Sequence, residues 1–335
     1  MAQTFVYVSC AKSREIDVFS LDTESGEIRL RQRLQTSGAS QPLRLSANRR
    51  VLYAGAKAEN CLMAYAIDPN SGELTVLGGV PTSGEPTYVS SDHAGRVAFC
   101  ASYAGNSLSV FPLDANGLPR PACQIESPLI RAHSCLMDAS NQWLLVPLLG
   151  EDAIRIYGLS IDGHLSPNDS PMVKVHPGSG PRHLVFSPNN RWVYCLNELS
   201  CTIDTFAFSA DSGRLSLQRS QDALPPGFTG KPWAAELRIT PNGRFLYASE
   251  RTASVIAAFA IEQDSGCLHV VGHYPTEKQP RGMDIDPSGH WLVAVGQLSG
   301  SLTVHALNQQ TGDLTVGQRH DTGQNPICVE ILALP

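Results

Sequence analysis

The stretch Gly180–Ser200, GPRHLVFSPNNRWVYCLNELS, predicts two short strands joined by a turn. Two apolar runs flank Pro188-Asn189-Asn190, which is a typical turn sequence. A tight hairpin reverses the chain, so the residues just before its first strand and just after its second strand meet at one end. Arg182, His183 and Glu198 are therefore expected on one rim. Taken alone, these residues are better explained by a structural ion pair at a strand end, because such pairs are common; recurrence of the pattern along the chain would favour a functional role.

The pattern does recur along the chain. A strand start marked by proline is found at Pro42, Pro86, Pro181, Pro232, Pro280 and Pro326, and Ala132 fills the missing place, with spacings of 44 to 51 residues. Each of the first six starts is followed by an apolar run, a turn, a second strand, a variable loop and an alternating third strand. A second turn, usually with Asp, Ser or Asn and a glycine, then leads to a more polar fourth strand. Four antiparallel strands in a unit of this length make a propeller blade.

The two ends of the sequence are half-units that complete each other. The N-terminus begins in the middle of a unit with Phe5-Val6-Tyr7-Val8, and the C-terminus supplies an isolated first strand from Ile327. Together they predict an all-β, seven-bladed β-propeller whose ring is closed by the C-terminal strand, with residues 1–335 as a single domain. A linear solenoid is the alternative, but it would need polar caps at both ends.

Composition limits the partners of the protein. With 335 residues, 42% hydrophobic and 17% charged, the chain can bury a large core. The net charge of −6 and the absence of a lysine-arginine run argue against nucleic acid as a partner. No apolar segment is long enough to cross a membrane, and no secretory signal is evident. The nine cysteines are scattered, with no C-x-x-C pair. We therefore expect a cytoplasmic monomer without structural zinc.

In a propeller, the first strands of the blades line a central channel, so unusual residues at their starts converge on one funnel. These residues, together with those in the matching loops between second and third strands, are His133, Arg182, His183, Trp233, Glu236, Arg281, Tyr103, Glu198 and Arg251. Arginines among the carboxylates would repel a cation, so no metal is expected. The sequence contains no Gly-rich phosphate loop before a helix, no G-x-S-x-G nucleophile elbow and no H-E-x-x-H zinc motif, so no cofactor is expected. Several arginines around a histidine and a glutamate suit a small anion bearing a carboxylate, lactone or phosphate.

Short motifs in matching blade positions carry a resemblance to a known family. They are Ser91-Asp-His-Ala-Gly, Ala132-His-Ser, Gly180-Pro-Arg-His, Leu196-Asn-Glu-Leu, Trp233-Ala-Ala-Glu, Glu250-Arg-Thr-Ala-Ser and Gln279-Pro-Arg-Gly. The whole chain resembles the lactonase family of seven-bladed propellers, which includes bacterial 6-phosphogluconolactonases, and more distantly the fungal carboxy-muconate cyclases. The resemblance implies that His133, Arg182, Glu198 and Arg251 are the catalytic residues. The chain departs from the family at Arg131-Ala132, where a cysteine or Gly-Cys is usual, and at Glu236 and Glu250, where aspartate is usual.

Three functions are compatible with these residues. The first is hydrolysis of a sugar-acid lactone, with 6-phosphogluconolactone of the pentose phosphate pathway favoured by the resemblance. Water would be activated by Glu198 or His133, with Arg182 and Arg251 binding the oxyanion and the substrate anion. His183, Trp233, Glu236, Arg281 and Tyr103 would complete the substrate site. The second is a lactonising cycloisomerase acting on a muconate-type acid. The third is a non-enzymatic binding platform, which would not need this set of residues.

Overall fold

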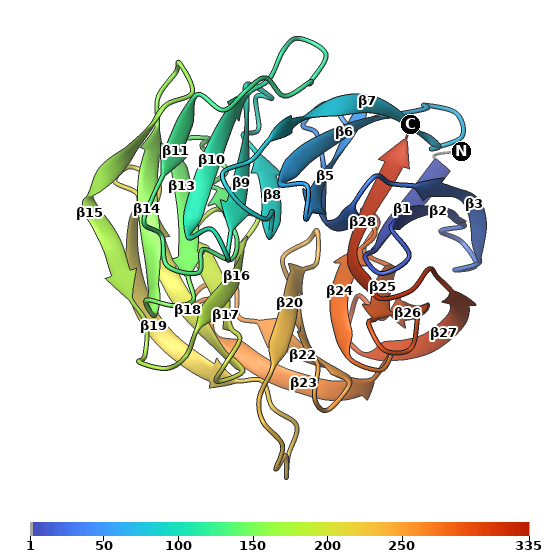
Figure 1. Cartoon of the computed structure of the whole chain (residues 1–335). Helices are drawn as coiled ribbons and strands as arrows, with labels where there is room; N and C mark the ends of the chain where they lie inside the picture. Colours follow the sequence, from blue (N-terminus) through green and yellow to red (C-terminus); the bar gives the residue numbers. More distant parts are fainter. Residues whose placement is uncertain (1–2, 335) are drawn as a thin grey trace.

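The computed structural model describes residues 3–334, apart from the side chain of Ser40. Seven four-stranded antiparallel sheets stand around a central axis as the blades of a closed ring (Figure 1). Residues 3–334 contain no α-helix. The predicted all-β, seven-bladed propeller is therefore confirmed.

The blades follow the chain in order, and the strands of each blade succeed one another from the axis outward. Blade 1 consists of β28 (Pro326–Leu334), β1 (Gln3–Cys10), β2 (Glu15–Leu21) and β3 (Ile28–Gln35). Blade 2 consists of β4 (Ala39–Leu45), β5 (Val51–Lys57), β6 (Cys61–Ile67) and β7 (Leu74–Pro81). Blade 3 consists of β8 (Tyr88–Ser91), β9 (Val97–Ser102), β10 (Ser107–Pro112) and β11 (Gln124–Glu126).

The remaining four blades have the same order. Blade 4 consists of β12 (Leu136–Met137), β13 (Trp143–Leu148), β14 (Ala153–Leu159) and β15 (Leu165–Lys174). Blade 5 consists of β16 (Pro181–Phe186), β17 (Trp192–Asn197), β18 (Thr202–Ser209) and β19 (Arg214–Asp222). Blade 6 consists of β20 (Ala234–Ile239), β21 (Phe245–Glu250), β22 (Val255–Ile261) and β23 (Leu268–Pro275). Blade 7 consists of β24 (Pro280–Ile285), β25 (Trp291–Gly296), β26 (Ser301–Leu307) and β27 (Leu314–Asp321).

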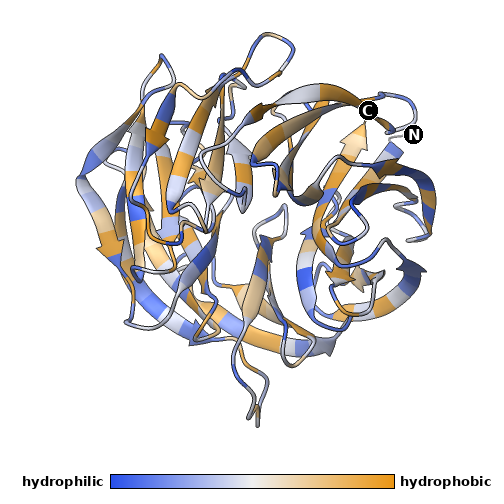
Figure 2. Ribbon diagram, viewed as in Figure 1, coloured by the Kyte–Doolittle hydropathy of each residue, from blue (hydrophilic) through white to orange (hydrophobic). Residues whose placement is uncertain are grey.

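The core lies between the blades and is built by the second and third strands. All six residues of β17 are buried, whereas the outer strand β19 of the same blade is mostly exposed. Figure 2 shows this difference as hydrophilic colour along β19. Each pair of neighbouring blades faces the other with apolar side chains, so removal of this surface from water is the main force that holds the ring together.

The turn glycines of the repeat lie where neighbouring blades meet. At each of the seven seams, a residue at or near the start of a second strand packs on the glycine in the outer hairpin of the next blade. A Cβ atom on Gly312 would overlap the ring of Phe245, and one on Gly26 would overlap the ring of Trp291. The contact between Trp291 and Gly26 joins blade 7 to blade 1. Glycine is needed here both for close approach and for a positive φ, which is 75° at Gly26.

Strand pairing across the two chain ends completes blade 1. Strand β28 runs antiparallel to β1, with Gln3 opposite Leu334 and Val8 opposite Val329. Figure 1 shows the blue N-terminal and red C-terminal strands side by side. The predicted closure by the C-terminal strand is therefore correct. Among residues 3–334, no helix has the length and apolarity needed to cross a bilayer.

The ring has two different faces. We call the face with the hairpins between first and second strands the turn face, and the opposite face the loop face. Side chains at the turns hold the hairpins: Asp138 Oδ1 accepts hydrogen bonds from the backbone NH groups of Gln142, at 3.0 Å, and Trp143, at 2.8 Å. Asp, Ser and Thr recur at this turn position because their side-chain oxygens can satisfy these backbone donors.

Candidate active site

Glu198 is at the centre of the polar side chains on the loop face. It follows β17, and its Oε2 atom accepts a hydrogen bond from Arg182 Nε at 2.8 Å and forms an ion pair with Arg251 Nη2 at 3.2 Å. Its Oε1 atom accepts a hydrogen bond from Trp233 Nε1 at 3.2 Å. Burial acts to raise the pKa of Glu198, but Arg182 and Arg251 hold that pKa below its ordinary value. The carboxylate is therefore ionised at neutral pH.

β-Bulges aim two of the arginines into the channel. In β16 the pairing passes from Pro181 to His183, which leaves Arg182 as the extra residue, and Arg281 occupies the same place in β24. The sequence suggested that Arg182 and His183 precede their strand; instead the strand begins at Pro181, and the two residues lie within it. Because of the bulge, both can line the channel although they are adjacent in sequence.

Arg251 is positioned by backbone and by an aromatic ring. Its guanidinium donates to the carbonyl oxygens of Trp233, at 3.1 Å, and Ala234, at 2.9 Å, and lies 3.8 Å from the centre of the Trp233 ring. Glu250 holds the same segment, because its carboxylate accepts hydrogen bonds from the backbone NH groups of Trp233 and Ala253. Burial, and then the charge of Arg182, lower the pKa of Arg251 to about 8, while Glu198 opposes this shift.

His133 lies beside Glu198 and is buried. Its Nε2 atom is 3.9 Å from Glu198 Oε2, and its Nδ1 atom has no hydrogen-bond partner among the described residues. Its ring makes an edge contact with the ring of Tyr103, at 5.9 Å between centroids. Burial, followed by the charges of Arg182 and other neighbouring cations, lowers the pKa of His133 well below its usual value. The imidazole is therefore neutral and able to accept a proton.

A second layer of charge lies deeper in the channel. His183 Nδ1 is 2.6 Å from Glu236 Oε1, and Arg238 Nη1 is also 2.6 Å from that oxygen. Arg238 continues to Asp284, with 3.0 Å between Nε and Oδ1. Burial lowers the pKa of His183 to about 4 although Glu236 opposes the shift, and despite its burial the pKa of Glu236 falls to about 2 beside Arg238. Glu236 is thus an ionised partner of His183 and Arg238.

The two layers meet at a small cavity of about 30 Å³ in the channel. Its lining includes His133, Arg182, His183, Glu236 and Arg281. A cavity of this size holds one or two water molecules but no sugar ring. A sugar-sized ligand must therefore bind above it on the loop face, where Trp233 is 38% exposed.

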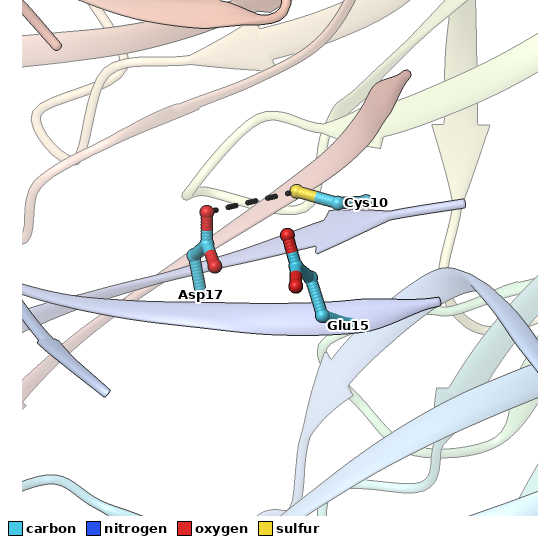
Figure 3. Close-up of side chains that lie close together, drawn as sticks. All are labelled: Cys10, Glu15 and Asp17. Carbon is cyan, nitrogen blue, oxygen red and sulfur yellow. Dashed lines mark hydrogen bonds between the residues drawn. The ribbon is translucent and has the colours of Figure 1, made fainter. Parts of the chain in front are cut away.

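One further group of acidic and thiol side chains lies in blade 1 (Figure 3). Cys10, Glu15 and Asp17 form the only set of three potential metal ligands found in residues 3–334. Cys10 Sγ donates to Asp17 Oδ2 at 3.8 Å, and that oxygen also accepts a hydrogen bond from Gly323 N at 2.9 Å. Arg33 Nε lies 3.5 Å from Asp17 Oδ1 and would repel a cation there. The cluster instead fastens the loop before β28 to blade 1.

All the residues selected from the sequence lie in or beside the channel, but at different depths. Glu198, Arg182, Arg251, His133 and Trp233 are in contact around one carboxylate, and Tyr103 adjoins them through His133. Glu236 contacts His183 rather than Glu198, so its carboxylate belongs to the deeper layer of the channel. His133 was expected to open an inner strand, but that strand, β12, contains only Leu136–Met137.

Sequence reasoning missed the residues that support the deeper layer. These are Arg238, Asp284, Tyr88, Arg44 and Glu330, all on inner strands. The signal was present, because alternate positions of an inner strand face the channel, so a charged residue two positions after Glu236 points the same way. Tyr88 contacts the edge of His183, with 5.2 Å between ring centroids.

Comparisons with known proteins agree with this architecture. The family model described as "Lactonase, 7-bladed beta-propeller" matches residues 5–331. Curated proteins named 6-phosphogluconolactonase, from Serratia proteamaculans and Yersinia pestis, are each 41% identical to the chain; the alignments cover 98% of both chains for the first and 97% for the second. The solved structure of the periplasmic gluconolactonase PpgL of Pseudomonas aeruginosa superposes with a TM-score of 0.92, at 28% identity and with 100% of both chains covered.

The family model matches parts of all seven blades, and the two relatives are aligned over 97–98% of the chain. The chain belongs to the lactonase family of seven-bladed β-propellers.

Proposed function

We propose that the protein hydrolyses a sugar-acid lactone on its loop face, with 6-phosphogluconolactone as the preferred substrate. The observation that carries this proposal is the ionised Glu198, which is held by Arg182 and Arg251 next to the neutral His133. The names of the relatives at 41% identity support the same substrate class. A propeller that only displayed a binding surface would not need a proton acceptor and available arginine donors at one point.

Lactone hydrolysis needs a proton acceptor and an oxyanion site. Water attacks the carbonyl carbon while His133 or Glu198 takes its proton; the ring C–O bond then breaks, and the ring oxygen is protonated as the hydroxyl of the open sugar acid. A guanidinium has five N–H donors, and Arg182 and Arg251 each use only some of theirs on Glu198 and backbone oxygens. Their remaining donors can bind the developing oxyanion.

Arg281 is the best candidate for a phosphate ligand. Its guanidinium forms no hydrogen bond or ion pair with the described residues, although it lines the channel beside Arg182. Burial, followed by the charge of Arg182, lowers the pKa of Arg281 to about 10, so it remains a cation at neutral pH. Arg281 is half-buried, and its N–H donors have no hydrogen-bond acceptor among the described residues, so an anionic substrate can bind them. Trp233 and Tyr103 offer flat surfaces for the sugar at the mouth.

The first prediction separates the substrate class from the preference for phosphate. Purified protein should hydrolyse both 6-phosphogluconolactone and gluconolactone faster than the spontaneous reaction, and carboxymuconate should remain unchanged. Arg281→Ala should lower kcat/KM for the phosphorylated lactone by about 10- to 100-fold, as expected for a lost charge-assisted contact, and affect gluconolactone much less. Lys278→Ala removes an exposed neighbouring charge and serves as the control. Equal losses on both lactones would contradict the role of Arg281, and turnover of carboxymuconate alone would contradict lactone hydrolysis.

We also propose that the enzyme acts in the cytoplasm as a monomer and needs no metal. All nine cysteines are free thiols, which suits a reducing compartment, whereas the similar PpgL is named as periplasmic. Cell fractionation, light scattering and an activity assay after exhaustive chelation test these points. Recovery of the activity in the periplasmic fraction, or a mass of twice 36.1 kDa, would contradict them.

A further inference from the structure

The turn-face end of the channel is hollow on one side because of how the ring closes. Within residues 3–334, blades 2 to 7 each place a hairpin between first and second strands there, whereas the first and second strands of blade 1, β28 and β1, do not follow each other in the sequence. A cavity of about 300 Å³ lies beside this gap. It is lined by the end of β28, by the hairpins of blades 2 and 3, and by residues of blades 4 and 7. Its volume is at the lower end of the range for small-molecule sites. We call it the turn-face pocket.

Arg44 contributes a guanidinium with available donors to this pocket. It belongs to β4, and its only ion pair within the described structure joins Nη1 to Glu330 Oε1 at 3.6 Å. That distance is too long for a strong hydrogen bond, and the five N–H donors of Arg44 form no other hydrogen bond or ion pair with residues 3–334. The side chain is 36% exposed, so an anion in the pocket can reach it.

Arg49 is a second cation at the pocket, and its backbone is strained. Its φ is 58°, in the left-handed region that favours glycine. The corresponding residues in the hairpins of blades 3 to 7 are Gly95, Asn141, Asn190, Gly243 and Gly289, all with positive φ. Both asparagines use their side chains to bind an aspartate of the preceding blade, at 3.1 and 3.0 Å. The guanidinium of Arg49 has no such partner among residues 3–334, so its donors are available to a ligand.

Neither of the two carboxylates at the pocket pairs with Arg49. Asp92 already accepts hydrogen bonds from the backbone NH groups of Arg96 and Val97 and from the side chains of Arg96 and Asn141. Glu330 is buried, and burial, opposed by Arg44 and assisted by Asp284, raises its pKa. Asp92 is paired with Arg96 and Glu330 with Arg44, so among the described residues that line the pocket Arg49 is the charged group without a partner.

We propose that the turn-face pocket is a second binding site, for a small molecule bearing a phosphate or carboxylate group, in which Arg44 and Arg49 bind that group. The site is on the opposite end of the channel from Glu198, so it is separate from the proposed lactone site. Replacement of Arg49 by glycine would relieve the strain and remove the ligand contact at once.

Crystals of the full chain soaked in tungstate, a heavy-atom analogue of phosphate, test the location directly. Anomalous density is expected between Arg44 and Arg49 in the wild type and in Arg50→Ala, which removes an exposed neighbouring arginine that does not line the pocket. The density should be lost in Arg49→Gly. No density at the pocket in the wild type, or equal density in Arg49→Gly, would overturn the proposal.

Calorimetric titrations with inorganic phosphate and with gluconate distinguish the two ligand groups in solution. Arg49→Gly should weaken binding of at least one of them by about tenfold or more, as expected for a lost charge-assisted hydrogen bond, whereas Arg50→Ala should leave it unchanged. Arg49→Gly should also melt at a higher temperature than the wild type, which shows that lost binding does not come from unfolding. Binding that is insensitive to Arg49 belongs to the loop face and would overturn the second site. Lactonase activity is measured separately, so failure of either proposal is visible by itself.

Discussion

Glu198 and His133 are the two candidates for the proton acceptor, and their surroundings differ. Glu198 already contacts two guanidinium groups and an indole N–H, which weakens it as a base. His133 is neutral and has one nitrogen without a partner among residues 3–334, but the arginines around it disfavour the imidazolium that it would form. An anionic substrate would offset the charges of these arginines and so raise the pKa of His133. Binding itself would then make the histidine a better base.

Substitution of each residue decides between them. Glu198→Gln keeps the shape of the side chain, and if Glu198 is the base, turnover should fall by about 10²- to 10⁴-fold with a smaller change in KM. If His133 is the base, His133→Ala should cost more turnover than Glu198→Gln. His164→Ala, at an exposed turn, is the control for loss of a histidine. Near wild-type turnover in both active-site variants would show that the reaction occurs elsewhere.

The sequence could predict which residues reach the channel but not how they pair. Spacing within the repeat placed Arg182 and Glu198 at one rim, and their 2.8 Å contact confirms this. The spacing could not predict that Glu236 contacts His183. The two residues belong to different blades, and their contact depends on the height of each inner strand along the axis of the ring. Arg238 lies inside a strand, so no turn or strand end marks it, and only the alternation of side chains two positions after Glu236 indicates that it faces the channel.

At the scale of strands, the repeat predicted nearly every element because each blade carries its own turn sequences. The exceptions have local causes. In blade 4 the inner strand is cut to Leu136–Met137, because the segment before it has left the ladder apart from one bridge, between Ala132 and Leu148. The bulges at Arg182 and Arg281 were also unforeseen, since one extra residue does not disturb the apolar pattern on either side.

Removal of β28 should damage the whole ring. The strand supplies the inner edge of blade 1 and carries Glu330 into the channel. A chain that lacks residues 324–335 exposes an unpaired edge and the apolar surface beneath it, which favours aggregation. We expect insoluble protein or loss of a cooperative thermal transition. A truncated chain that melts like the complete one would contradict the role of this strand in closure.

For the whole molecule, buried neutral histidines predict sensitivity to acid. Burial lowers the pKa of His183 and the pKa of His305 to about 4 each, and that of His133 is also low. Histidine in the unfolded chain has a pKa of about 6.5, so these residues bind protons more readily when the protein is unfolded. The free energy of unfolding is therefore highest above this pH and decreases as the pH falls toward 4. The pKa values of Asp284 and Glu330 are raised and oppose this loss.

Urea unfolding measured between pH 7 and pH 4 tests the direction of this pH dependence. The free energy of unfolding should decrease steadily on acidification in the wild type. His305 lies in β26, and its Nε2 atom is within hydrogen-bond distance of Thr276 Oγ1, at 3.0 Å. His305→Gln can keep such a contact without a titrating ring and should reduce the pH dependence. A profile that is flat in the wild type, or unchanged in the variant, would show that these histidines are not linked to folding.

The pairing of the two chain ends in blade 1 makes the protein a natural subject for circular permutation. Gln3 and Leu334 are opposite each other in one ladder, where Cα atoms are about 5 Å apart, so a short linker can join the ends. New ends placed near Gly227, between blades 5 and 6, would give seven uninterrupted blades held in a ring by side-chain contacts alone. New ends within the exposed hairpin around Asp264 would instead divide blade 6 between the N-terminal and C-terminal segments, as blade 1 is divided in the natural order. The difference in stability between these two permutants measures what the shared blade contributes to closure.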